Sequence, residues 1–321
     1  MLRFVWLSMV AFFETIAHRA SRGPLRPSWS LEFQSVVRLL RKDWEATSAW
    51  EPARLRADID ARPYPQTTVR KVKTTDAPLG GVPTRRFVPP GAKKAPVVLF
   101  FHGGSYIYGS ARTTHAELLA RLAVASGCEV LGVDYRLAPE HAYPAQLEDA
   151  LAAFDALVAS GVPAESIVVA GDSAGGNLAF YLQLALRDRG SPQARSAVLL
   201  SPWSDLTMPG ESFTKNDPYD YGTRETLLAQ ARLFAGELPL GDPRLSPTHA
   251  RCEGLAPVLV VAGEVEIPHD DILTLVKRMK DAGVDVTVHV AKDMPHNPAV
   301  FAAYHPSGAK ALERMARFVA P

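Results

Sequence analysis

A serine among small residues is the feature of this sequence with the clearest chemical meaning. Ser173 stands in the segment GDSAGGN at 171–177, directly after an apolar run at 166–170 and before a stretch with helical periodicity. A G-x-S-x-G pattern between a strand and a helix is typical of a nucleophile elbow, whose turn is so tight that its flanking residues need almost no side chain. The strained serine then exposes its hydroxyl. The pattern therefore predicts a nucleophile at Ser173.

A second glycine-containing segment follows another apolar run. Residues 97–101 are continuously apolar, and His-Gly-Gly-Ser follows at 102–105. Glycines at such a point allow backbone N–H groups to converge on a developing oxyanion, and Ala174, beside the serine, would supply a further N–H. We expect His102 itself to be structural, because the chain order serine, acid, histidine requires a later histidine as the base.

The candidate general base comes late in the chain. Met-Pro-His-Asn-Pro at 294–298 follows the last expected strand, which favours His296 over His289, whose side chain points away from the apolar face of that strand. The acid should follow the expected strand at 258–262. Residues 263–271 offer four carboxylates, and their spacing alone does not choose among them: Glu264, Glu266, Asp270 and Asp271.

Composition limits the class of protein. The chain has 321 residues, 47% of them hydrophobic and 21% charged, as expected of a globular α/β protein with a large core. Its formal net charge of +1 gives no indication of a nucleic-acid partner. Cys128 and Cys252 are the two cysteines, which excludes a disulfide framework and a four-cysteine zinc site.

The N-terminal region reads as helices without strand partners. Residues 4–13 are almost all apolar and resemble the core of a signal peptide, but Glu14 follows and no A-x-A cleavage site does. We expect an amphipathic helix, packed on the protein or resting on a membrane surface, and further helices at 30–43 and 52–60. We expect a cytoplasmic protein, with membrane association or secretion as open alternatives.

Strands and helices alternate from residue 69 onward. An antiparallel hairpin is expected from 69–74 and 84–88. Strands are expected at 97–101, 129–134, 166–170, 196–200, 258–262 and 286–290, and helices at 113–125, 145–159, 177–189, 271–282 and 306–319. This alternation predicts an α/β fold with a mostly parallel sheet flanked by helices. Residues 66–208 and 248–321 would form the catalytic domain, with 1–65 and the insertion 209–247 forming a helical cap.

Three motifs in order resemble those of the hormone-sensitive-lipase family of α/β-hydrolases, which includes bacterial carboxylesterases and arylacetamide deacetylase. The motifs are His-Gly-Gly at 102–104, DYRLAPE at 134–140 and GDSAGGN at 171–177, and the resemblance extends from about residue 85 to the C-terminus. It implies an α/β-hydrolase fold with a cap, and hydrolysis of short- to medium-chain acyl esters without a metal or organic cofactor.

Carried over by position, the resemblance assigns residue roles. It makes Ser173 the nucleophile and His296 the base. The backbone around the oxyanion would be that of Gly103, Gly104, Ser105 and Ala174. It places Glu266 where the family has its catalytic aspartate and Asp270 at the second aspartate, and we prefer Glu266 because Asp270 stands where a helix begins. The chain departs from the family at Ser105, a glycine there, and at 297–298, where an aromatic residue is usual.

The sequence thus predicts a serine carboxylesterase acting through an acyl-enzyme. A non-hydrolytic binding protein is the alternative, since plant gibberellin receptors resemble this family but have lost the histidine. The retained Ser173 and His296 favour hydrolysis. The expected partner is a small-molecule ester and not nucleic acid, while a peripheral membrane contact through the first helix and a homodimer remain open.

Overall fold

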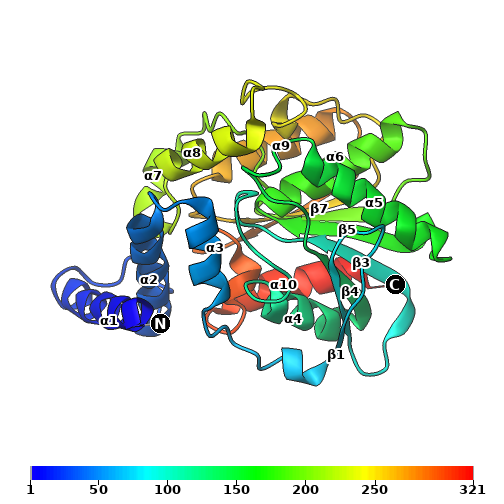
Figure 1. Ribbon diagram of the computed structural model, residues 1–321. Coiled ribbons are helices and arrows are strands. Elements are labelled where there is room, and N and C mark those ends of the chain that lie inside the picture. Colours follow the sequence, from blue (N-terminus) through cyan, green and yellow to red (C-terminus); the bar gives the residue numbers. More distant parts are fainter. Residues whose placement is uncertain (1, 321) are drawn as a thin grey trace.

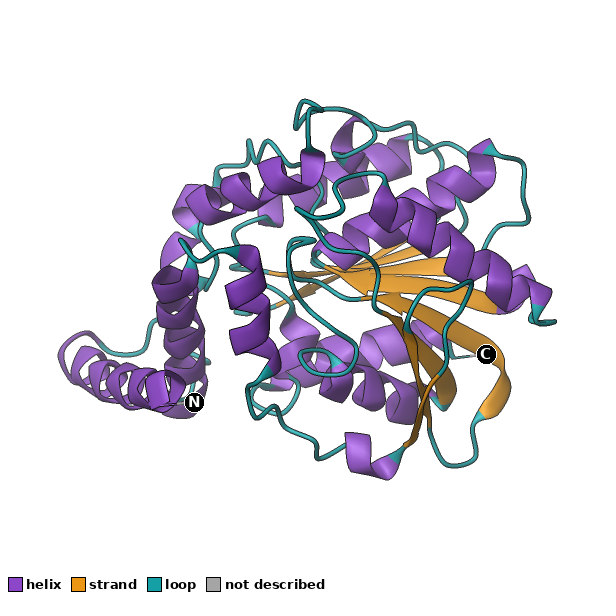
Figure 2. Ribbon diagram, viewed as in Figure 1, coloured by secondary structure: helices purple, strands orange, loops and turns teal. Residues whose placement is uncertain are grey.

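The computed structural model describes residues 2–320, and in this part of the chain an eight-stranded sheet lies between two layers of helices (Figures 1 and 2). The strand order is β1-β2-β4-β3-β5-β6-β7-β8. The strands are β1 (Lys73–Asp76), β2 (Thr84–Val88), β3 (Lys93–Phe101), β4 (Cys128–Val133), β5 (Ile167–Asp172), β6 (Ser196–Leu200), β7 (Val258–Gly263) and β8 (Val286–Ala291). β2 is antiparallel to β1 and β4. The other six strands, β3 to β8, are mutually parallel. The predicted mostly parallel sheet is confirmed.

Helices cover both faces of the sheet (Figure 2). One face carries α5 (Ala145–Ala159), α6 (Ala174–Asp188) and α9 (His269–Asp281), and the other carries α4 (Ala116–Ser126) and α10 (Pro306–Val319). The part of β3 at 97–101 is apolar because both of its faces are covered: Leu99 and Phe101 enter one core and Val98 and Phe100 the other, all completely buried. A parallel strand between two helical layers has no solvent face.

The N-terminal region forms α1 (Leu2–Arg22), α2 (Leu31–Thr47) and α3 (Pro52–Asp60). Ser30 caps α2 by accepting the N–H of Phe33 at 3.0 Å, and α2 runs four residues beyond its expected end at 43. Phe33 is fully buried against Phe301, with ring centroids 5.3 Å apart. The second helix is therefore part of the core. No helix within residues 2–320 is long and apolar enough to cross a membrane.

The first strand begins later than expected. Val69–Lys71 is a 3₁₀ turn and β1 starts at Lys73, whereas the sequence pattern indicated a strand over 69–74. The carboxylate of Glu117 in α4 accepts the N–H groups of Thr68, at 2.9 Å, and Val69, at 3.3 Å. The next three N–H groups, of Arg70, Lys71 and Val72, donate to carbonyls within the turn. These local bonds and the Glu117 contact to Val69 use the donors that a strand would need.

The segment 209–247, which we expect to be an insertion, follows β6 and contains α7 (Ser212–Lys215) and α8 (Arg224–Ala235). Its first part lies beside α2 in Figure 1, where Arg41 binds the Asp217 carboxylate at 3.1 Å and the Gly222 carbonyl at 3.1 Å. Segments almost 180 residues apart in sequence therefore meet over the same part of the molecule.

Candidate active site

Ser173 occupies the sharp turn between β5 and α6. Its φ of 54° and ψ of −119° are strained for a residue with a side chain, and its N–H donates to the Leu200 carbonyl at 2.9 Å. The turn also brings α6 very close to β3: a Cβ on Gly175 would lie 1.9 Å from the carbonyl oxygen of Phe101. Only glycine fits at position 175, which is the physical reason for the second glycine of the G-x-S-x-G pattern.

Glu266 and His296 come from the loops after β7 and β8 and meet side by side. Glu266 is completely buried; its Oε2 lies 2.7 Å from His296 Nδ1 and its Oε1 accepts the N–H of Gly263 at 2.6 Å. With the proton on Nδ1, the imidazole donates to the carboxylate and its Nε2 can accept a proton. Burial alone would lower the pKa of His296, but the hydrogen bond and charge of Glu266 outweigh it and raise the pKa.

Asp270, the alternative acid, lies elsewhere. Its Oδ2 accepts the N–H of Ser212 at 2.8 Å, and its own N–H donates to Ser212 Oγ at 3.0 Å. These two bonds join the start of α9 to α7. Asp270 thus holds two helix ends together, as its position near a helix start suggested, while Glu266 contacts the imidazole.

The loop after β3 lies beside Ser173. Gly104 and Ser105 line the same cavity as Ser173, and Ser105 has a φ of 53°, in the left-handed region where the family's glycine would be unstrained. Gly103 differs from the expectation, because its N–H donates to Asp172 Oδ1 at 2.9 Å. The N–H groups left for an oxyanion are those of Gly104, Ser105 and Ala174.

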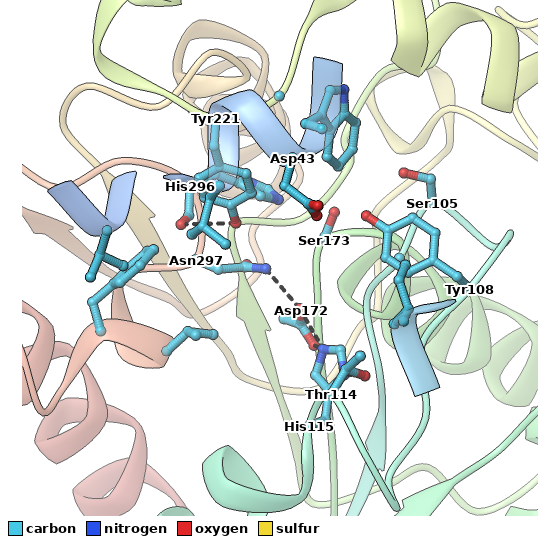
Figure 3. A pocket seen from close by; sticks show the side chains of 18 of the residues that line it. Asp43, Ser105, Tyr108, Thr114, His115, Asp172, Ser173, Tyr221, His296 and Asn297 are labelled. Carbon is cyan, nitrogen blue, oxygen red and sulfur yellow. Dashed lines mark hydrogen bonds and ion pairs between the residues drawn. The ribbon is translucent and has the colours of Figure 1, made fainter. Parts of the chain in front are cut away.

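Asp172, which precedes Ser173, binds three separate segments of the chain. Besides the Gly103 N–H, its carboxylate accepts the Asn297 side-chain N–H at 2.8 Å and contacts His115 Nε2 at 3.1 Å (Figure 3). Burial would raise the pKa of Asp172, but His115 and the Gly103 hydrogen bond lower it. The sequence pattern predicts no role for Asp172, His115 or Asn297: Asp172 is one residue of a motif, and Asn297 is a departure from the family pattern.

His102 holds its own loop. The ring is buried, its Nδ1 lies 2.7 Å from the carbonyl oxygen of Gly103, and it stacks on Tyr135 at 4.4 Å between centroids. The Tyr135 hydroxyl donates to the His102 carbonyl at 2.6 Å. Through these contacts His102 stabilises the conformation of the loop that it begins.

A cavity of about 700 Å³ opens onto Ser173 and His296. Its walls are mainly apolar and come from α2, α3, the insertion and the loop after β3. Among the lining residues are Leu39, Leu40, Trp44, Leu55, Ile59, Tyr108, Trp203, Phe213, Tyr221, Leu227 and Ile267. The N-terminal helices and the segment 209–247 thus both line the cavity that contains Ser173, as a cap over the site would require.

The serine and the imidazole line this cavity without being bonded to each other. Among the described residues, no hydrogen bond of 3.5 Å or less joins Ser173 Oγ to His296. Catalytic hydrogen bonds are often long before substrate binds and tighten in the complex. The missing bond therefore does not argue against a Ser173–His296 pair.

Comparison with known proteins identifies the class of fold. A family model described as the α/β hydrolase fold matches residues 98–300, which include the loop after β3, the elbow and the His296 loop. The crystal structure of an esterase from the bacterial hormone-sensitive lipase family has 35% sequence identity, a TM-score of 0.77, and covers 96% of this chain and 97% of its own. The chain therefore belongs to the α/β-hydrolases of the hormone-sensitive-lipase family, a family of carboxylic ester hydrolases.

Two curated relatives extend the likeness over most of the chain. An acetyl-hydrolase from Streptomyces hygroscopicus is 35% identical over 301 residues, which are 90% of this chain and 96% of that protein. An esterase from Acinetobacter venetianus is 34% identical over 234 residues, 71% of this chain and 75% of that protein. The likeness to the acetyl-hydrolase thus extends beyond the matched family region.

Proposed function

We propose that this protein is a serine carboxylesterase that hydrolyses short- to medium-chain acyl esters. His296 takes the proton of Ser173 as its oxygen attacks the ester carbonyl, and then gives that proton to the leaving alcohol. Water, activated by the same imidazole, attacks the acyl-enzyme and releases the acid. The N–H groups of Gly104, Ser105 and Ala174 bind the oxyanion in both steps.

The observation that carries this proposal is the 2.7 Å contact between the buried Glu266 carboxylate and His296 Nδ1, beside a strained serine in the same cavity. Such a carboxylate fixes the tautomer that leaves Nε2 free for the serine, and it stabilises the imidazolium formed during attack. A binding protein would not need this pair, and the esterase names of the relatives point the same way.

The apolar cavity supports an apolar acyl or alcohol group. We propose that residues 1–65 and 209–247 act together as its cap, because residues from both line the space above Ser173. A volume of about 700 Å³ accommodates chains well beyond acetyl.

The test is hydrolysis of p-nitrophenyl acetate, butyrate, octanoate and palmitate by the purified chain and by its Ser173→Ala variant. We expect turnover of the shorter esters and a fall in kcat of about 10⁴- to 10⁶-fold in the variant. Ser160→Ala, which changes a serine at the end of α5, is the matched control. An intact protein that binds these esters without turning them over would favour the binding-protein alternative.

A further inference from the structure

One carboxylate of the insertion contacts the loops of both the acid and the base. Asp220 Oδ2 accepts the N–H of Ile267, the residue after Glu266, at 2.8 Å. Its Oδ1 accepts the N–H of His296 at 3.2 Å and that of Tyr221 at 2.8 Å. Asp220 is only 2% exposed, so these bonds are shielded from water.

Neighbouring residues of the insertion hold the same two loops. Asn216 donates from Nδ2 to the Glu266 carbonyl at 2.9 Å, and Ser212 Oγ donates to the Ile267 carbonyl at 2.7 Å. The Tyr221 hydroxyl donates to the His296 carbonyl at 3.3 Å (Figure 3). The segment 212–221 therefore binds the backbone on either side of the Glu266–His296 pair.

We propose that Asp220 is a positioning residue, whose carboxylate sets the spacing between the Glu266 loop and the His296 loop and so keeps the acid and base in register. The inference rests on the proposed esterase function. Glu266 and His296 follow the neighbouring paired strands β7 and β8, whose loops are first joined by the Val265 N–H, which donates to the Met294 carbonyl at 3.0 Å. Asp220 adds bonds beyond that contact, at Ile267 and at His296 itself. A carboxylate can accept an N–H on each oxygen at once, which an amide in the same place cannot do.

The charge of Asp220 acts on the base as well. Burial raises the pKa of Asp220 to about 6, the charge of Glu266 adds to the rise, and His296 and the N–H bonds oppose it. The titratable groups facing Asp220 are Glu266, His296 and, on its own segment, Tyr221, whose own pKa burial raises well above its usual value. When ionised, Asp220 favours the imidazolium and contributes to the raised pKa of His296.

The decisive variant is Asp220→Asn, which keeps the shape but places an NH₂ group against one of the backbone donors. We expect kcat on p-nitrophenyl butyrate to fall about 10- to 10²-fold with KM close to wild type, the size of effect that a small misplacement of catalytic groups produces. The acid limb of the kcat/KM profile should also move to lower pH, because His296 loses a neighbouring anion. A role in folding alone would move neither.

Asp242→Asn is the matched control, since Asp242 also accepts a backbone N–H within the insertion, that of Arg244 at 2.8 Å, away from both loops. If the wild-type protein hydrolyses the ester but Asp220→Asn has the same kcat and an unmoved acid limb, the positioning proposal is overturned and the esterase function stands. An inactive wild type would instead overturn the proposed function. If Asp220→Asn does not fold, Asp220→Glu replaces it: the longer side chain displaces the carboxylate, so wild-type kcat in that folded variant would also overturn the proposal.

Discussion

Asp172 Oδ1 accepts the N–H of Gly103 at 2.9 Å, so the residue before Ser173 holds the loop that we propose binds the oxyanion. A Cβ on Gly103 would lie 2.4 Å from Asp172 Oδ2, which explains why this position needs a glycine. The elbow and the loop after β3 are thereby held against each other, and the next two residues, Gly104 and Ser105, line the cavity.

Replacing Asp172 by Asn should therefore disturb both folding and catalysis. The amide would bring an NH₂ group against buried donors, and a buried donor left without an acceptor costs about 1 to 3 kcal/mol of the free energy of unfolding. Urea unfolding measures that loss, and kcat on p-nitrophenyl butyrate should fall in parallel. The exposed carboxylate of Asp155 provides the control Asp155→Asn, and equal stability of the two variants would contradict the expectation.

The choice of acid is tested by comparing Glu266→Gln with Asp270→Asn in the ester assay. Glu266→Gln should lose about 10³- to 10⁴-fold in kcat, because the amide favours the wrong imidazole tautomer. Asp270→Asn should stay near wild type, since its remaining oxygen can still accept the Ser212 N–H. The reverse result would make Asp270 the acid.

The pH dependence follows from the raised pKa of His296. The base must be neutral to take the serine proton, and Glu266 stabilises the protonated ring, so activity should be lost as pH falls through a value above the ordinary histidine pKa of about 6.5. A pH profile of kcat/KM at constant ionic strength measures this midpoint. We expect it to lie lower in Glu266→Gln, and a wild-type midpoint below about 6 would be inconsistent with the Glu266–His296 pair.

Trp44 of α2 tests the contribution of the N-terminal helices to specificity. Its ring lines the cavity between Tyr108 and Tyr221, with centroids 6.5 Å from each. Trp44→Ala should enlarge the cavity and shift the ratio of kcat/KM for octanoate over butyrate about tenfold toward the longer chain. Trp50→Ala is the control, because Trp50 packs under Arg54 outside the cavity. An unchanged ratio would mean that α2 does not contribute to the preference for acyl-chain length.

Phe33 tests whether the second helix is integral to the fold. Its side chain is fully buried, so Phe33→Ala should lower the free energy of unfolding by about 3 to 5 kcal/mol. Phe13 of α1 is 63% exposed, and Phe13→Ala should change it by no more than about 0.5 kcal/mol. Calorimetry or urea unfolding compares the two. Equal effects would mean that α2 does not belong to the cooperative core.

The sequence by itself determined the features that depend on neighbouring residues. Alternating apolar runs and amphipathic stretches predict the order of strands and helices, because burial on one or both faces imposes a period on the chain. The elbow could be recognised because its constraint is local: small residues must flank Ser173 for the turn to close. His296 was selected by its place after the last strand.

The tertiary structure decided the features that depend on distant partners. Spacing could not choose among four carboxylates, and it is the loop after β8 that brings His296 to Glu266. The turn before β1 is bound at Thr68 by Glu117, about 50 residues away. The part played by Asp220 depends on Ile267 and His296, which follow it by 47 and 76 residues. Such hydrogen bonds produce no periodic pattern in the sequence, because each depends on which distant segment folds back beside the residue. The residues next to it in the sequence do not decide the bond.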